Sequence, residues 1–404
     1  MILLSLASKQ IWPHVLTVAY LKPAYLLLLH SKDETESRGP ATRLKRFFDR
    51  SSLIPKGCTR LAIISDSDFN EIERTLDSLL VSNQFPLADC ALNFTGGNKL
   101  MATAGFRWSA RRGIRSFYLE RRNLLTWFEP RDGDLLTRTE KIDGHITDNL
   151  DAVDLLRCQM DASEVERSGQ TITLNQPGSD MPETEFFKRI ANGNPMKNFL
   201  LVTGATDSEE KAGDDLEFNT AAVLLKLGVP RVQRSLRLKV KSAPHISSRY
   251  PHAEIDLLFN WNGRLWLVDC KDRKPTEDLV AALRRDLPCG LNRETELLLT
   301  RIANELKTSQ TKALKEDLLA VRETGGLLGQ IVCVRKSKLP DEVLQFARHN
   351  HIEVVPKTDL VAGFRALLFP DRPATTEELL ALVNQHRDVP EHPRTFHQES
   401  ETTY

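Results

Sequence analysis

A stretch of alternating residues around one Asn-Gly pair, residues 254–271, constrains this chain more than any other part of it. Asn262-Gly263 favours a two-residue hairpin turn, because both residue types tolerate the positive φ angles that a type I′ turn needs. In such a hairpin Trp261 pairs with Arg264, and every further pair of residue numbers has the same sum. The turn therefore predicts which residues of the two strands lie opposite each other.

Charged residues gather at the open end of this predicted hairpin. Asp256 falls opposite Asp269 and Glu254 falls opposite Lys271, and the strand period of two places all four on one face. The other face is apolar and core-like, with Ile255, Leu257, Phe259, Trp266, Val268 and Cys270. Leucines share the charged face, so we expect that face to be partly buried: Leu258, Leu265 and Leu267.

Paired carboxylates beside a lysine suit metal-dependent phosphodiester hydrolysis. Mg²⁺ or Mn²⁺ held by a few carboxylates makes a bound water nucleophilic and stabilises the leaving oxygen. Without a cation, two ionised aspartates on adjacent strands repel each other. A lysine two residues after one of them can hold charge near the scissile phosphate. The alternative is a solvent-facing hairpin whose charges only line its wet side.

Length and composition set broad limits. A chain of 404 residues is long for a single core, which favours two domains. Lys+Arg and Asp+Glu are both 55, so any nucleic-acid site must be a local patch. The six cysteines form no CxxC pair, which fits a reducing compartment. Apolar runs near the N-terminus are too short and too interrupted for a membrane span or a signal core, so we expect a cytoplasmic protein.

The first ~130 residues alternate short apolar runs with helical patterns, which predicts an α/β domain with a parallel, doubly wound sheet. Strands are expected at Ile2–Ala7, Ala24–Leu29, Arg60–Ile64, Cys90–Phe94 and Ser116–Leu119. Helices are expected at Trp12–Leu21, Thr42–Phe48, Asp68–Leu80 and Leu100–Arg112.

This rhythm stops at residues 131–198, which are rich in Asp, Gly, Ser and Pro and are interpreted as a linker with a small helical module. A second α/β domain is expected at residues 199–385, followed by a polar tail at residues 386–404. Within it we expect a helix at Asp214–Leu227, strand material at Arg231–Val240, the hairpin, and helices around Asp278–Arg285 and Glu294–Ser309. A strand at Gln330–Val334, a helix at Asp341–His349 and a strand at Ile352–Val355 follow.

A glycine pair marks the end of the fourth strand of the first domain. The segment reads Asn93-Phe94-Thr95-Gly96-Gly97-Asn98-Lys99 and lies between a strand and a helix. Glycines let the backbone approach a ligand closely, and the helix N-terminus and the lysine favour an anion. A tight turn without a ligand is the alternative.

Two runs of basic residues have two interpretations each. The run after the glycine pair is taken mostly as a solvated face: Arg107, Arg111, Arg112 and Arg115. The run before the hairpin can track a phosphate backbone or form a solvated strand edge: Arg231, Arg234, Arg237, Lys239, Lys241 and Arg249.

The glycine segment resembles the ligand loop of CARF (CRISPR-associated Rossmann fold) domains, which reads Asn-x-Thr-Gly-Gly-Thr-Lys, with Asn98 in place of the usual threonine. Ser8-Lys9-Gln10, after the first strand, corresponds to the first ligand loop of that family, and Asp66 lies at the same sheet edge. The resemblance implies a cyclic-oligoadenylate site formed by Ser8, Gln10, Thr95, Gly96, Gly97, Asn98 and Lys99.

The hairpin resembles the PD-(D/E)xK core of restriction-endonuclease-like nucleases, through Asp256 and the run Asp269-Cys270-Lys271. That resemblance implies metal ligands at Asp256, Asp269 and the Cys270 carbonyl, with Lys271 assisting the attacking water. Glu217 stands in Gly213-Asp214-Asp215-Leu216-Glu217, which resembles the leading helix of that core. Glu217 is then a third acidic group, or an ordinary first-turn glutamate stabilised by the helix dipole.

A CARF-like domain followed by a PD-(D/E)xK-like domain resembles the ancillary nucleases of type III CRISPR systems. The resemblance implies a homodimer around one cyclic oligoadenylate, usually cyclic tetra-adenylate, that activates Mg²⁺- or Mn²⁺-dependent cleavage of DNA and, in some members, RNA. Two alternatives stay open: a non-catalytic ligand sensor that only binds nucleic acid, and a nuclease without a nucleotide switch.

Overall fold

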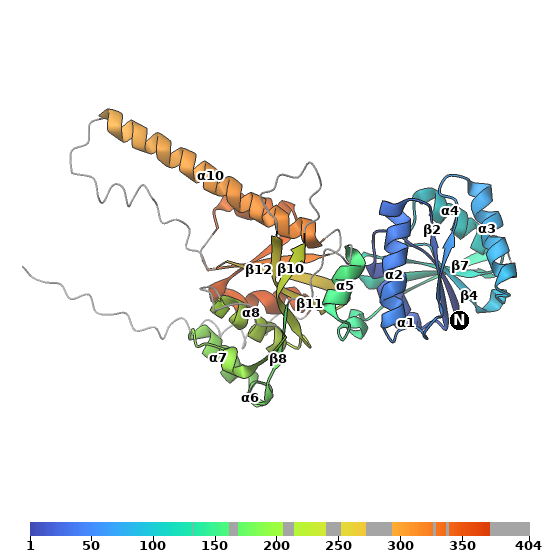
Figure 1. Ribbon diagram of the computed structural model, residues 1–404, viewed down its shortest axis with the longest axis horizontal. Coiled ribbons are helices and arrows are strands. Elements are labelled where there is room, and N and C mark those ends of the chain that lie inside the picture. The colour runs from blue at the N-terminus through green and yellow to red at the C-terminus, as the bar shows by residue number, and fades with distance from the viewer. Residues whose placement is uncertain are drawn as a thin grey trace, which may run out of the picture.

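The computed structural model (Figure 1) describes residues 1–131, 133–160, 169–204, 214–239, 252–271, 293–325, 329–336 and 339–371. Within these residues the chain forms two seven-stranded sheets, one in each half of the sequence, both flanked by helices. The predicted α/β class with two successive sheets is therefore confirmed. The expected helix at 278–285 and the tail at 386–404 lie outside the described residues.

The first sheet has the strand order β3-β2-β1-β4-β5-β6-β7, and its first five strands are parallel. Its strands are β1 (Ile2–Leu6), β2 (Tyr25–His30), β3 (Thr59–Ile63), β4 (Cys90–Asn93), β5 (Arg115–Glu120), β6 (Leu124–Arg131) and β7 (Asp134–Lys141). Its helices are α1 (Trp12–Leu21), α2 (Gly39–Arg50), α3 (Phe69–Ser82) and α4 (Lys99–Arg111), and the short segment η1 (Glu34–Arg38) precedes α2.

Both faces of this sheet are buried, as expected for parallel strands covered by helices. Leu26 and Leu28 of β2 join the core beneath α1 and α2, whereas Leu27 and Leu29 join a second core beneath α3 and α4. The order of connection reverses between β1 and β4, and such a reversal leaves a crevice at the carboxyl ends of the strands. The loops after β1 and β4 lie at this point.

The segment expected as a linker, residues 131–198, contributes strands to both sheets. It supplies β7 to the first sheet, and β8 (Gln170–Leu174) to the second. Nearly every residue of β7 is exposed, so this edge strand has no apolar alternation that could identify it in the sequence. A helical module is present: η4 (Gly144–Thr147), α5 (Ala152–Gln159), α6 (Gln176–Asp180) and α7 (Glu183–Ala191).

The second sheet has the order β14-β13-β12-β11-β10-β8-β9. Besides β8 it contains β9 (Leu200–Thr203), β10 (Val232–Lys239), β11 (His252–Trp261), β12 (Arg264–Lys271), β13 (Gln330–Arg335) and β14 (Ile352–Pro356). Its helices are α8 (Asp214–Lys226), α10 (Arg293–Gly325), α11 (Asp341–His349) and α12 (Leu360–Leu368). In Figure 1, α10 projects away from the body of the domain.

One hydrophobic core is shared by the two halves of the molecule. It runs from β1 and β2 through α1, α2 and α5 to Leu258, Leu265 and Leu267 of the hairpin. Figure 1 shows α5 between α2 and the second sheet. Because α5 buries apolar side chains on both sides, it joins the first sheet to the second sheet, which carries the hairpin.

Candidate functional site

The hairpin between β11 and β12 has the predicted turn and register. Asn262 and Gly263 have φ angles of 49° and 70°, as a type I′ turn requires. Trp261 pairs with Arg264, and the same sum of residue numbers holds to the pair Leu257 and Val268. Continuing this register by one residue places Asp256 opposite Asp269.

The turn itself is packed against the first half of the molecule. A Cβ added to Gly144 would lie 2.5 Å from the backbone carbonyl of Asn262, so only glycine permits this approach. The Asn262 backbone N–H donates to Asp148 Oδ1 at 2.7 Å, and the side-chain amide of Asn260 donates to the Thr147 carbonyl. The hairpin that carries the carboxylates is therefore anchored by its turn to η4 of the segment between the domains.

The two faces of the hairpin are used largely as expected. Most of the predicted apolar face lies in one buried core with α8: Leu257, Phe259, Trp266, Val268 and Cys270. Ile255 is different, because it joins the core on the other side, with Leu258 and Leu267. The charged face is therefore mostly covered near the turn, and this confirms that it is not simply a wet surface.

Asp256 and Asp269 form an acidic pair, in which Asp269 is buried and Asp256 is half-buried. Asp256 Oδ2 accepts a hydrogen bond from the Cys270 backbone N–H at 2.6 Å. The pKa of Asp256 is raised to about 7, chiefly by burial. The charges of Asp269 and Glu217 also raise this pKa, whereas the charge of Lys271 lowers it. Asp256 thus exchanges its proton near neutral pH, which is the range that acid–base chemistry uses.

Asp269 is held between two basic side chains. Lys271 Nζ lies 2.8 Å from Asp269 Oδ1, and Arg335 Nη2 lies 3.1 Å from Oδ2. Burial disfavours the charged lysine, but the carboxylates of Asp269 and Asp256 outweigh burial and raise the pKa of Lys271. Lys271 is therefore cationic at neutral pH.

Arg335 was not found by sequence reasoning. It follows the apolar run of β13, and β13 pairs in parallel with β12, so that Arg335 lies beside Lys271 in the register. Arg335 is only 5% exposed, and its Nε has no hydrogen-bond partner among the described residues. A basic residue at the end of an otherwise apolar strand is the signal that could have identified it.

Glu217 lies on α8, within electrostatic reach of Asp256, and forms an ion pair with Arg234. The distance from Arg234 Nε to Glu217 Oε2 is 2.6 Å, and Arg234 also donates to Gln170 Oε1 at 2.9 Å. The guanidinium stacks on the Phe218 ring, 4.4 Å from its centroid. Arg234 is thus a buried partner of Glu217, and does not line a solvated strand edge. Of the same basic run, Lys241 and Arg249 lie outside the described residues.

Glu254 does not join the acidic pair. It is exposed, and its partner in the register of β10 and β11 is Arg237. The Cys270 thiol points into the core, where its sulfur lies 3.9 Å from Thr220 Oγ1, and burial raises its pKa well above the usual value. Cys270 can therefore offer a metal its main-chain carbonyl only, since a buried neutral thiol is not a ligand.

The donor set fits an oxygen-preferring cation. The two aspartates supply carboxylate oxygens, the ligands that Mg²⁺ and Mn²⁺ favour. The raised pKa of Asp256 reflects first its burial and then the neighbouring charge of Asp269, and a bound cation would favour the ionised form. Within the described ranges, no three His, Cys, Asp or Glu side chains gather at metal-binding distance. A cation here would thus rely on two carboxylates, completed by carbonyl, water or phosphate oxygens.

The predicted sensor loops come together at the crossover between β1 and β4. A Cβ on Gly96 would lie 1.9 Å from the Leu6 carbonyl oxygen and 3.1 Å from Ser8 Oγ, so the backbones of the two loops touch. Gly97 has a φ of 77°, a conformation that favours glycine. The structure therefore brings Ser8 beside the glycine pair, although they are far apart in the sequence.

Hydrogen bonds fix the shape of the glycine segment. The Leu119 backbone N–H donates to Thr95 Oγ1 at 2.8 Å. Asn98 caps α4 by accepting from the Met101 N–H at 2.8 Å, and its amide donates to the Asp66 carbonyl at the same distance. Gln10 and Lys99 are exposed at this edge. The loops after β1, β3 and β4 thus form one rim.

The arginines at the end of α4 are exposed, as expected for a solvated face, and they are also paired. Arg107 and Arg111 form ion pairs with Glu73, and Arg112 forms one with Asp77. Both carboxylates come from α3, which packs beside α4. Helix neighbours of this kind cannot be identified from the sequence of one helix alone.

Among the described residues, no helix combines the length and apolar character that a membrane span requires. No family model matches the chain, and no curated protein matches its sequence.

Solved structures of two-domain proteins do match nearly the whole chain. Can2 from Sulfobacillus thermosulfidooxidans, solved in complex with cyclic tetra-adenylate, matches with a TM-score of 0.56 and 15% identity, over 90% of this chain and 98% of Can2. VC1899 from Vibrio cholerae matches with a TM-score of 0.57 and 12% identity, over 91% of this chain and 97% of that protein. The chain therefore shares the fold of these two proteins, and the predicted architecture of two successive α/β domains is confirmed.

Proposed function

We propose that this protein is a metal-dependent endonuclease that a cyclic oligoadenylate switches on. The observation that carries the proposal is the pair of carboxylates, buried Asp269 and half-buried Asp256, with Lys271 in an ion pair with Asp269. A chain whose fold matches Can2, a protein solved with cyclic tetra-adenylate, presents this pair at the predicted position. The reaction is hydrolysis of phosphodiester bonds in DNA, and RNA is a second substrate to test.

The residues of the hairpin have distinct roles in this proposal. Asp256 and Asp269 hold Mg²⁺ or Mn²⁺ together with the Cys270 carbonyl, and the cation supplies a water of lowered pKa and charge neutralisation at the phosphate. Lys271, cationic and 37% exposed in its side chain, reaches from Asp269 toward solvent and donates to the water or to a phosphate oxygen.

Glu217 and Arg335 support the pair from opposite sides. Glu217 adds a third negative charge near Asp256, and its ion pair with Arg234 holds it in place. Arg335 forms an ion pair with Oδ2 of Asp269, and Lys271 forms one with Oδ1. We assign Glu217 the role of positioning the attacking water and Arg335 the role of a positioning residue.

The ligand of the first domain is proposed to be cyclic tetra-adenylate, bound by Ser8, Gln10, Thr95, Gly96, Gly97, Asn98 and Lys99. The rim offers close backbone approach at the glycine pair, the N-terminus of α4 and one exposed lysine, all of which favour a phosphate. A cyclic ligand is symmetric, which suits two copies of the rim across a two-fold axis.

A homodimer is part of the same proposal. Besides the symmetry of the ligand, α10 projects from the second domain and exposes Leu297, Leu298 and Ile302, by 64%, 57% and 39%. Neighbouring exposed leucines and isoleucines on one helix are typical of a surface that another chain covers.

A chain of contacts links the rim to the hairpin. Lys9 forms an ion pair with Glu36, and Ser37 Oγ donates to the Ala7 carbonyl at 3.2 Å, so the loop after β1 is tied to η1. The segment η1 runs directly into α2, α2 packs on α5, and α5 packs on β11 and β12. A ligand that shifts the loop can therefore shift the hairpin, provided that it binds one arrangement better than the other.

The test is cleavage of plasmid DNA, and of a labelled RNA in parallel, by the full chain with Mn²⁺, with and without cyclic tetra-adenylate. We expect cleavage that requires both the metal and the ligand. Equal cleavage without the ligand would favour a nuclease that lacks a switch. Binding of nucleic acid without cleavage in any condition would favour a non-catalytic regulator.

A further inference from the structure

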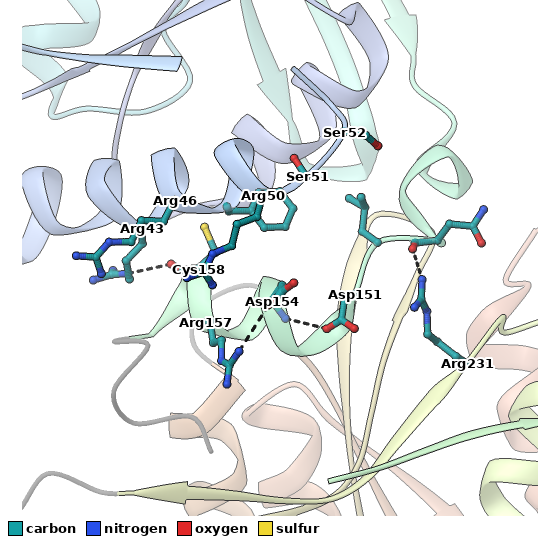
Figure 2. A pocket seen from close by; sticks show the side chains of 13 residues that line it. Arg43, Arg46, Arg50, Ser51, Ser52, Asp151, Asp154, Arg157, Cys158 and Arg231 are labelled. Carbon is teal, nitrogen blue, oxygen red and sulfur yellow. Dashed lines mark hydrogen bonds and ion pairs between the residues drawn. The ribbon is translucent and has the colours of Figure 1, made fainter. Parts of the chain in front are cut away.

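A cavity lies between α2 of the first domain and α5, beside the residues through which the two helices pack on each other. Its volume is about 360 Å³, and it is lined by α2, the loop after it, α5 with the residues just before it, and the residue that precedes β10. Figure 2 shows α2 along one side of this cavity, α5 below it and Arg231 at its far end. It is distinct from the sensor rim and from the carboxylate pair, because it shares no lining residue with either.

Arginines dominate the lining of this cavity. Five of them come from three elements far apart in the sequence, namely Arg43, Arg46, Arg50, Arg157 and Arg231. Among the residues that the structure describes, two carboxylates line the cavity. Asp151 is engaged as the cap of α5, where it accepts from the Val153 and Asp154 backbone N–H groups. Asp154 lies 3.7 Å from Arg157. The carboxylates thus leave most of the positive charge uncompensated.

The five arginines divide into structural and exposed ones. Arg43 donates to the Cys158 carbonyl at 2.9 Å, and Arg231 donates to the Asn149 carbonyl, so both hold the segment around α5. Arg46 and Arg50 are exposed, and in the part of the chain that the structure describes neither side chain has a hydrogen bond or an ion pair. These two guanidinium groups are available to a ligand.

The arginines at the end of α4, in the same domain, have acidic partners that Arg46 and Arg50 lack. Arg107, Arg111 and Arg112 on α4 are neutralised by the carboxylates of α3. Arg46 and Arg50, one helical turn apart on α2, face α5 with no such partner. Like charges at this spacing repel each other, so an anion between them stabilises the arrangement.

We propose that the cavity between α2 and α5 is a second anion site, which takes phosphate groups. A guanidinium offers a planar fork of donors that matches two phosphate oxygens at once. The volume of about 360 Å³ falls within the roughly 300–1,000 Å³ of small-ligand sites, enough for a diphosphate or a nucleotide. The phosphate comes from a free small phosphate compound or from the backbone of a nucleic-acid strand.

The position of the site gives it a function. Its walls come from both domains, because α2 belongs to the first sheet and Arg231 leads into β10 of the second. A phosphate bound to Arg46 and Arg50 on one side and to the α5 segment on the other holds α2 to α5. The proposed path from the sensor rim to the hairpin passes through these two helices, so the anion stiffens that path. The binding site itself stands whether or not the hairpin is a nuclease.

The test is calorimetric titration of the full chain, without divalent cations, in two arms. One arm uses inorganic pyrophosphate, and the other uses single-stranded oligothymidylate. The variant is Arg46→Glu/Arg50→Glu, and the matched control is Arg60→Glu/Arg131→Glu, which makes the same charge change at two exposed arginines outside the cavity. We expect the first variant to weaken binding at least about tenfold and the control to change it less than about twofold.

The two arms identify the source of the phosphate. Tight pyrophosphate binding that the cavity variant removes indicates a small phosphate compound, whereas an effect confined to oligothymidylate indicates a strand backbone. Thermal unfolding checks that the variants fold, and Arg46→Ala/Arg50→Ala replaces the glutamate variant if that one does not. Saturable binding by neither ligand to the unmodified chain, or equal weakening by variant and control, would overturn the proposal. Loss of binding in Lys99→Ala with no loss in the cavity variants would overturn it too.

Discussion

The first sheet presents its candidate site on loops beyond the ends of parallel strands, whereas the second sheet carries its candidate site inside two antiparallel strands. The rim around Gly96 and Gly97 consists of backbone, small side chains and one exposed lysine. Of the pair in the hairpin, Asp269 is buried and Asp256 is half-buried.

The two sites differ in whether their charged side chains have charged partners. Every acidic group of the hairpin site has a basic partner or a neighbour that shifts its pKa: Lys271 and Arg335 for Asp269, Arg234 for Glu217, and Asp269 for Asp256. The rim depends instead on close backbone approach. We therefore expect substitutions in the hairpin to change chemistry, and substitutions in the rim to change regulation.

The substitution Asp269→Asn should distinguish the two sites most clearly. The amide keeps the shape but loses the charge that holds the cation, so cleavage should fall below detection with Mn²⁺ and cyclic tetra-adenylate present. Ligand binding at the rim should be unchanged, as measured by calorimetry. Residual cleavage at the level of the unmodified chain would remove Asp269 from the site.

Metal affinity should depend on pH through Asp256. Burial and the charge of Asp269 raise the pKa of Asp256 to about 7, so below that pH a divalent cation must displace a proton. The apparent Kd for Mn²⁺ should fall about tenfold per pH unit up to about pH 7 and level off above it.

The same pKa predicts a stability effect of the opposite sign in the metal-free protein. The folded state binds the Asp256 proton more tightly than the unfolded state does. Stability should therefore fall as pH rises from about 4, the ordinary aspartate pKa, to about 7, and then stay level. Calorimetry of Mn²⁺ binding and thermal unfolding, each measured across this range, check both statements, and Asp256→Asn should abolish both trends.

Gly96→Ala should damage the rim and leave the hairpin intact. Its Cβ would lie 1.9 Å from the Leu6 carbonyl oxygen, so the two loops must separate. Overpacking of this kind costs about 1–3 kcal/mol, which should appear as weaker binding of cyclic tetra-adenylate and lost activation. Gly57→Ala is the control, because it strains the backbone at a φ of 81° without a steric clash and lies outside the rim. Equal ligand affinity in the two variants would contradict the proposed rim.

Arg335→Gln tests whether a residue outside the predicted site holds Asp269 in position. Removing a residue that orients a metal ligand typically costs about 10–100-fold in activity or metal affinity. Arg335→Lys should recover part of the loss, since it restores the charge but not the fork of donors. If Arg335 were only a packing residue, the glutamine and lysine variants would lose the same amount.

Lys99→Ala should have the smallest effect. The exposed ammonium contributes one charge-assisted bond to a phosphate, so we expect about a tenfold loss of affinity for cyclic tetra-adenylate. Cleavage at saturating ligand should remain, because the hairpin is unchanged. A loss of cleavage that excess ligand does not restore would place Lys99 in the switch rather than in binding alone.

Local patterns in the sequence predicted much of the fold and both candidate sites. The helix at Trp12–Leu21 and the helix at Asp341–His349 have the expected bounds. The second has a clear helical period, whereas the first is apolar and buried over most of its length. The edge strand β7 was missed because it is exposed on both faces. Arg335 was missed, and the pairing of Arg234 with Glu217 was not predicted, because their partners are distant in the sequence.

The sequence by itself determined the register of the hairpin. Two adjacent residues, Asn262 and Gly263, select the turn, and the turn determines which residues meet, so no distant contact is needed. Only the tertiary structure decided what surrounds those residues. The order of strands brings Arg335 beside Lys271, and the packing of α5 between two sheets creates the arginine-lined cavity. Such contacts depend on how whole elements pack together, and residues distant along the chain carry no local signal of that packing.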